Sequence, residues 1–271
     1  MPLAGTIPSE IGLATNLKLF DLYLSNVTST IPTSFGLLSN LETLSVIRSP
    51  ITGPIPSELG HLVNLTTLQL HDNALSSTIP TELSRLNAIE TMHLYNNWLT
   101  GTIPTRVQSL TNLQSLMLHW NLLSGTIAPT LFNPILEEID FEVNSLSGTI
   151  PSEVGLSSNL RHLFFGENNL NGTIPTEVGL LTNLESFSVY FNSLTGTIPL
   201  DSLAKLTNLQ LLYLDTNYLV GTLNPLFCAA ETNFTTFDNE RFPWMFQLDA
   251  DCYDDDVIDR QVVCDCCTGC Y

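Results

Sequence analysis

Residues Ile89–Pro104 read IETMHLYNNWLTGTIP, and residues Leu184–Pro199 read LESFSVYFNSLTGTIP. Both follow the frame L-x-x-L-x-L-x-x-N-x-L-x-G-x-I-P, which returns along the chain at about 24 residues, a period typical of stacked repeats. A copy of this size cannot bury a core alone, so the pattern predicts a solenoid in which neighbouring copies cover one another. The period can be followed at the residue before the proline and at its equivalents: Ile7, Ile31, Ile55, Ile79, Ile103, Ile127, Ile150, Ile174, Ile198 and Leu223.

Each half of the repeat predicts a short strand. In the first half, Leu68 and Leu70 alternate with polar residues, which indicates a strand with one buried side. Stacked copies would make a parallel sheet. In the second half, Leu99 and Ile103 are expected to point inward and Thr100 and Thr102 outward, and the proline that follows ends the strand. The remainder of each copy is expected to form irregular or short helical turns.

An asparagine column lies between the two predicted strands. A side-chain amide at this turn can bond main-chain groups that would otherwise be buried without partners. Ser25 and Ser49 hold this position in the first two full copies, and we expect the solenoid to be less well tied there because a hydroxyl reaches less far. The column consists of Asn73, Asn97, Asn121, Asn144, Asn168, Asn192 and Asn217.

These motifs resemble the leucine-rich repeat family, and the I-P ending resembles its plant-type subclass of receptor ectodomains and secreted inhibitors. The resemblance covers roughly residues 3–225. It implies an α/β fold: a right-handed solenoid, or horseshoe, with a parallel concave sheet, a short second sheet and irregular or 3-10 convex segments. It also implies that ligands bind on the concave sheet and that the chain is not an enzyme. We expect a solenoid over 1–225, made of a leading half repeat and nine repeats, and a cysteine-rich C-terminal cap over 226–271.

All six cysteines lie after the last repeat, which indicates a disulfide-stapled cap and leaves fifteen possible pairings. A zinc site made by the last four is the alternative, but no histidine follows and the spacing is cramped, so no metal or other cofactor is expected. Four Asn-x-Ser/Thr acceptor sequences agree with passage through the secretory route. The cysteines are Cys228, Cys252, Cys264, Cys266, Cys267 and Cys270; the acceptor asparagines are Asn26, Asn64, Asn171 and Asn233.

The composition excludes one class of partner. With 27 acidic against 8 basic residues and a formal net charge of -19, the chain would repel the phosphate backbone of a nucleic acid. No apolar run is long enough to span a membrane. We expect an extracellular or cell-surface location. Because Met1–Pro8 already reads as the second half of a repeat, we also expect the chain to be the distal part of a longer protein, with any signal peptide or anchor outside these residues.

The outward residues of the first-half strands are the candidate binding site, because exposed aromatics, histidines and carboxylates gather there. The alternative interpretation is that these side chains stack on their strand neighbours for local stability. The candidates are Tyr23, His71, His93, Tyr95, His119, Trp120, Glu138, Asp140, Glu142, His162, Phe164, Tyr190 and Tyr213.

One part of this face is expected to be acidic. Strand alternation and strand spacing predict that Glu142 lies beside His119 and Glu138 beside His162. Such a patch would change its charge in mildly acidic conditions or attract a cationic partner. Paired carboxylates are also found in glycosidases, but three on one strand with no indication of a pocket do not favour catalysis.

Threonine and serine columns follow the second-half strands, interrupted by Pro54 and Asn171. A regular surface of methyls and hydroxyls resembles that of ice-binding solenoids, although threonine also suits an exposed strand on propensity alone. The leading hypothesis is a non-enzymatic extracellular recognition module that binds a protein, peptide or glycan on the concave sheet. The alternatives are the ectodomain of a membrane receptor, a secreted hydrolase inhibitor, and an ice-binding or matrix protein that uses the threonine columns.

Overall fold

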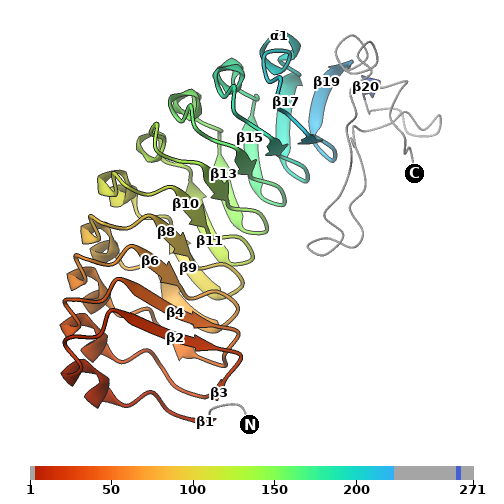
Figure 1. The fold of residues 1–271 in the computed structure, drawn as a ribbon. Coiled ribbons are helices and arrows are strands. Elements are labelled where there is room, and N and C mark those ends of the chain that lie inside the picture. Colours follow the sequence, from red (N-terminus) through yellow and green to blue (C-terminus); the bar gives the residue numbers. More distant parts are fainter. Residues whose placement is uncertain (1–3, 223–260, 264–271) are drawn as a thin grey trace.

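The structure is a computed structural model that describes residues 4–222 and 261–263. Figure 1 shows a curved solenoid in which each repeat adds one turn beside the previous one. Within these residues, strands form two nine-stranded parallel sheets and one two-stranded sheet, and strand order follows chain order throughout. The predicted leucine-rich repeat horseshoe of the α/β class, with its parallel sheets, is confirmed.

The first sheet, called the concave sheet below, is built from the first half of each repeat. Its strands pair in register, so that Leu68, for example, lies beside Met92 and Met92 beside Leu116. The strands are β2 (Leu19–Tyr23), β4 (Thr43–Ile47), β6 (Thr67–Gln69), β8 (Thr91–His93), β10 (Ser115–Met117), β12 (Glu138–Asp140), β14 (His162–Phe164), β16 (Ser186–Ser188) and β18 (Leu211–Tyr213).

The second sheet is built from the L-x-G-x-I half. Its last strand, β20, lies within the sequence assigned to the cap and pairs in parallel with β19. The strands are β5 (Thr52–Gly53), β7 (Ala74–Thr78), β9 (Trp98–Thr102), β11 (Leu122–Thr126), β13 (Ser145–Gly148), β15 (Asn169–Gly172), β17 (Ser193–Thr197), β19 (Tyr218–Thr222) and β20 (Gln261–Val263). At the N-terminal end, β1 (Ala4–Gly5) pairs separately with β3 (Asn26–Val27).

The convex side is made of short helices, as the sequence indicates. Each 3-10 helix follows an extended residue, usually the proline of the I-P motif, as Pro80 precedes η4. The helices are η1 (Ser9–Leu13), η2 (Thr33–Leu37), η3 (Ser57–His61), η4 (Thr81–Arg85), η5 (Thr105–Ser109), η6 (Pro129–Leu131), η7 (Ser152–Leu156), η8 (Thr176–Leu180) and the α-helix α1 (Leu200–Leu203).

The core is a set of apolar columns that run through the stack. Leu68, Leu70 and Leu75 are each 0% exposed, and they come from the two strands of one repeat and the turn between them. Each column continues into the next repeat, so a core side chain is covered by its own copy and by both neighbours. This arrangement explains why the frame of the repeat tolerates so little change at its apolar positions.

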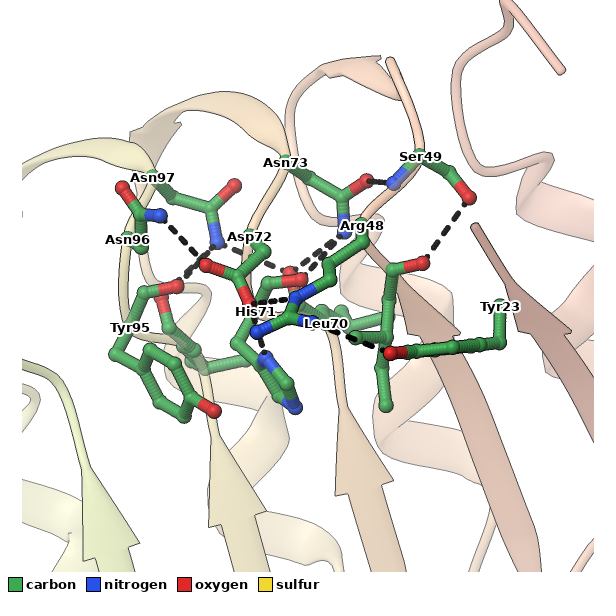
Figure 2. A network of polar contacts seen from close by, with 12 residues as sticks. Tyr23, Arg48, Ser49, Leu70, His71, Asp72, Asn73, Tyr95, Asn96 and Asn97 are labelled. Carbon is green, nitrogen blue, oxygen red and sulfur yellow. Dashed lines mark hydrogen bonds and ion pairs between the residues drawn. The ribbon is translucent and has the colours of Figure 1, made fainter. Parts of the chain in front are cut away.

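The asparagine column ties neighbouring repeats together. Asn97 donates from Nδ2 to the carbonyl oxygens of Leu94 (3.0 Å) and Tyr95 (3.1 Å) in its own repeat and of Leu70 (3.0 Å) in the preceding one. Its Oδ1 accepts from the Leu75 N–H at 2.9 Å, also in the preceding repeat. Figure 2 shows the side-chain amides of Asn73 and Asn97 at the turn of their repeats, with the bond from the Ser49 N–H to Asn73 Oδ1 across a repeat boundary. Each asparagine therefore satisfies buried main-chain groups on both sides of a repeat boundary, as predicted.

The serines at the head of the column behave differently. Ser25 Oγ and Ser49 Oγ hydrogen-bond to each other at 2.8 Å, and Ser49 Oγ also donates to the Ile47 carbonyl at 3.2 Å. Ser49 Oγ donates to one main-chain carbonyl, whereas the Asn97 side chain donates to three. The two N-terminal repeats thus have fewer side-chain bonds to their turns, in agreement with the shorter reach of a hydroxyl.

The glycine of the L-x-G-x-I motif is required by its backbone conformation and by a close neighbour. Gly101 has φ +77, a left-handed value that favours glycine, and a Cβ placed there would lie 2.8 Å from Thr78 Cγ2 of the preceding repeat. The same contact joins Thr102 to Gly125, where the distance would be 2.7 Å. The threonine methyl of one repeat therefore occupies the space that a side chain on the next glycine would need.

One pair of neighbouring repeats has neither the threonine nor the glycine of this contact. Pro54 stands where the other copies have the threonine, and Ser77 stands at the glycine position of the next repeat with φ 73. Because Pro54 has no branched methyl, Ser77 of the next repeat has space for its Cβ. These two residues line an open hollow of about 580 Å³ on this side of the solenoid.

Candidate functional site

The predicted binding residues all lie on the concave sheet or on the turns at its edge, but they are buried to very different degrees. Tyr23 and Trp120 are 52% and 48% exposed. His71, His119, Asp140, Glu142 and Tyr190 are buried, with exposed fractions of 4–9%. The half-buried members are His93, Tyr95, Glu138, His162, Phe164 and Tyr213.

Stacking accounts for much of this burial. The ring of Tyr95 lies between two imidazoles, with its centroid 4.1 Å from that of His71 and 4.2 Å from that of His119. The interplanar angles are 14° and 12°, so the three rings form a nearly parallel ladder across β6, β8 and β10. This is the strand-neighbour stacking that the sequence left open as the alternative, and it covers both faces of the Tyr95 ring.

A carboxylate lies at each end of this ladder. Asp72 Oδ2 is 3.1 Å from His71 Nδ1, and Asp140 Oδ2 is 2.8 Å from His119 Nδ1. Burial lowers the pKa of His71 below its usual value, although Asp72 favours the charged imidazolium. His71 is therefore a neutral member of the ladder at neutral pH.

Arg48 extends the polar network toward the N-terminal end (Figure 2). Its Nε lies 3.4 Å from Asp72 Oδ2, and its Nη1 donates to the Tyr23 hydroxyl at 3.2 Å. Burial alone would raise the pKa of Asp72, but hydrogen bonds from Asn96, His71 and Arg48 hold it below its usual value. Sequence reasoning did not select Arg48 or Asp72. Their spacing of one repeat, with opposite charges in one column, was the signal that could have found them.

The register of the acidic strand β12 agrees with its prediction. Glu138 pairs with His162, and Met117 pairs with Asp140, which places His119 level with Glu142 two residues further on. The prediction did not include two further contacts. His119 Nδ1 lies 2.8 Å from Asp140 Oδ2. Glu142 Oε1 accepts from the Ser188 hydroxyl at 2.6 Å, a partner two strands away.

Gly166 explains how Glu142 reaches so far. The absence of a side chain at Gly166 leaves a gap on the concave face, and the ring of Tyr190 fills it; a Cβ on Gly166 would meet Tyr190 Cε1 at 2.1 Å and Glu142 Oε1 at 2.9 Å. The Tyr190 hydroxyl donates to Glu167 at 3.0 Å. Burial, with Glu142 and Glu167 close by, strongly raises the pKa of Tyr190, so its hydroxyl stays protonated.

The exposed residues around this packed centre are those that a ligand can reach. Tyr23 and Arg48 lie toward the N-terminal end of the face, and Trp120 lies at the turn that follows β10. The part of the chain that the structure describes holds no group of three histidines, cysteines or carboxylates able to bind a metal ion. In the same residues, no helix combines the length and apolarity needed to cross a membrane. The predicted cysteines and Asn233 lie outside the described residues.

Comparison with known proteins defines the class. The Leucine Rich Repeat family model matches residues 64–86 and 159–181. The structure is similar to the plant peptide hormone receptor RGFR1 in complex with RGF2 (37% identity, TM-score 0.80, covering 82% of this chain and 36% of the receptor chain). It is also similar to the LRR ectodomain of the receptor kinase GASSHO1/SCHENGEN3 from Arabidopsis thaliana in complex with CASPARIAN STRIP INTEGRITY FACTOR 2 (30% identity, TM-score 0.70, covering 83% and 30%).

A third similar structure is a plant ice-binding protein, with 26% identity, a TM-score of 0.61 and coverage of 82% of this chain and 81% of that chain. No curated protein sequence matches. The solenoid with its asparagine column is thus that of a leucine-rich repeat protein. The chain belongs to the plant-type leucine-rich repeat family, and it spans about a third of the length of the two receptor chains described above.

Proposed function

We propose that the chain is a non-enzymatic extracellular recognition module that binds a peptide, or an extended protein segment, on the concave sheet. The observation that carries the proposal is the exposure of Tyr23 and Trp120 beside an internally stacked polar ladder. Because the side chains of the ladder are already packed against one another, they lose little conformational freedom on binding, which favours recognition of a flexible ligand.

The comparisons support this proposal by analogy. Two similar structures are described as receptors in complex with a peptide hormone or with a named factor. Their identities of 37% and 30% to this chain favour a similar ligand-binding role. The acceptor asparagines and the cysteine-rich segment add support for an extracellular location, and membership of a longer membrane receptor is part of the same proposal.

The test is a screen of a displayed peptide library, followed by affinity measurement on variants. We expect Tyr23→Ala and Trp120→Ala each to weaken binding of selected peptides by about tenfold, since truncated aromatic contacts at interfaces cost about 1–2 kcal/mol or more. Trp98→Ala is the matched control, because Trp98 is a comparably exposed tryptophan on the second sheet. Selected peptides that bind both concave variants as tightly as the unmodified chain would place the site elsewhere.

Ice binding is the second candidate, favoured by one specific observation. The ice-binding relative is matched over most of its own length, and the threonines of the second-sheet columns, such as Thr100 and Thr195, are exposed here. The contact of Thr78 and its equivalents with the next glycine gives the other column a structural role as well. A thermal hysteresis measurement on the chain and on Thr100→Lys decides: activity that the lysine abolishes supports this candidate, and no activity rejects it.

A further inference from the structure

The second sheet has an outer face that the concave proposal does not use. In β9 the outward residues are Trp98, Thr100 and Thr102, all exposed, while Leu99 between them is buried. The other strands repeat this pattern at equivalent positions. We call this surface the second-sheet face.

The second-sheet face carries no charge over a long distance. The second-sheet strands β5, β7, β9, β11, β13, β15, β17 and β19 contain no aspartate, glutamate, lysine or arginine. The chain as a whole has a formal net charge of -19. A face without charges on so acidic a protein can be covered without desolvating an ion, and this favours an uncharged partner.

Two aromatic rings stand out from this face. Trp98 on β9 is 65% exposed and Tyr218 on β19 is 70% exposed. Four strands lie between theirs in the sheet order, and neighbouring strands are about 4.8 Å apart, so the two rings are well separated along the face. Between them the outward residues are mostly hydroxyls and amides, such as Ser124 and Asn169.

This combination fits sugar rings better than it fits a protein. The apolar face of a sugar ring packs against an aromatic ring by dispersion, while hydroxyls and amides exchange hydrogen bonds with the sugar hydroxyls. A carboxylated polymer would be repelled by the charge of the chain, and a neutral polymer would not. We propose that the second-sheet face binds an extended, uncharged polysaccharide, with Trp98 and Tyr218 each stacking on a sugar ring.

Asn171 affects how the proposal is tested. It lies on β15, between the strands of the two rings, and it is one of the predicted glycan acceptors. A glycan attached there would cover the middle of the face. All proteins in the test therefore carry Asn171→Gln, which removes the acceptor and leaves the face uncharged.

The test measures retention by insoluble cellulose and mobility in gels that contain soluble mixed-linkage glucan, mannan or polygalacturonate. We expect binding to at least one neutral polymer and none to polygalacturonate. Trp98→Ala and Tyr218→Ala should each weaken binding about five- to tenfold and together abolish it, since a stacked ring contributes about 1 kcal/mol beyond its buried area. Trp120→Ala, an exposed tryptophan at the concave edge, should have no effect.

The binding should also be insensitive to salt, because no ion pair forms across the interface. Circular dichroism of each variant shows that it is folded before binding is compared. The proposal is overturned if the chain binds none of the neutral polymers. It is also overturned if the variant that carries both Trp98→Ala and Tyr218→Ala still binds. Because these residues lie away from the concave site, failure here leaves the peptide-binding proposal intact, and failure of the peptide screen leaves this one intact.

Discussion

Removal of Asn97 tests whether the asparagine column holds the repeats together. In Asn97→Ala the Leu75 N–H loses its only side-chain acceptor, at a site where Leu75 is fully buried. An orphaned buried N–H costs about 1–3 kcal/mol. The Leu94 carbonyl also loses a donor, but it still accepts from Asn121 at 3.1 Å. Adding about 1 kcal/mol for such weakened carbonyl bonds, we expect a loss of about 2–4 kcal/mol in the free energy of unfolding.

The assay is urea unfolding followed by circular dichroism, with amide hydrogen exchange as a local readout. We expect the midpoint to fall with little change in slope and the Leu75 amide to exchange much faster. Asn97→Asp should cost at least as much, because a carboxylate can accept from Leu75 but cannot donate to the carbonyls. The matched control is Asn112→Ala, an exposed asparagine with a single bond of 2.8 Å to the Asn87 carbonyl. If Asn97→Ala cost no more than this control, the asparagine column would not be what ties the repeats.

Three further outcomes follow from the structure. Gly125→Ala, where a Cβ would lie 2.7 Å from Thr102 Cγ2 at φ +82, should destabilise the chain by about 2 kcal/mol, and Thr102→Ser should recover part of that loss in a double-mutant cycle followed by urea unfolding. Ser77→Gly should raise the free energy of unfolding by about 0.5–1 kcal/mol, since it relieves a left-handed serine at φ 73; a fall in the urea midpoint would contradict this. Burial lowers the pKa of His71 in the folded state below its usual value of 6.5. As the pH falls, the unfolded chain therefore takes up a proton on His71 before the folded chain does. The contribution of neutral His71 to stability is complete above about pH 6.5 and is lost as the pH falls through the folded-state pKa. Urea unfolding between pH 7.5 and 5 should therefore show a smaller loss for His71→Gln than for the unmodified chain, and equal losses would count against the assignment.

The architecture could be predicted from sequence because the repeat states each structural requirement many times. The parallel sheets, the asparagine bonds and the pairing of Glu138 with His162 all depend on register, which a fixed period determines. A column such as Asn73 to Asn217 is also chemically uniform, so one argument serves every copy.

The details of the concave face could not be predicted in the same way, because there each residue occurs once and its rotamer decides its contact. Asp140 reaches His119, and Tyr190 fills the space above Gly166, through side-chain directions that alternation alone does not specify. The burial of the His71, Tyr95 and His119 ladder likewise depends on rings of similar size meeting on adjacent strands. Whether the candidate residues bind a ligand stays a prediction.

The contact between a threonine methyl and the glycine of the next repeat sets a rule for the order of the copies. A copy that offers a threonine can be followed by one with glycine, as in Thr102 and Gly125, whereas Ser77 follows the one copy that offers proline. The contact therefore limits which copies can be exchanged or duplicated without a clash, in evolution or in the laboratory. A transplanted copy that carries Ser77 in its left-handed conformation therefore fits best behind the copy that carries Pro54, which has no branched methyl at the point of contact.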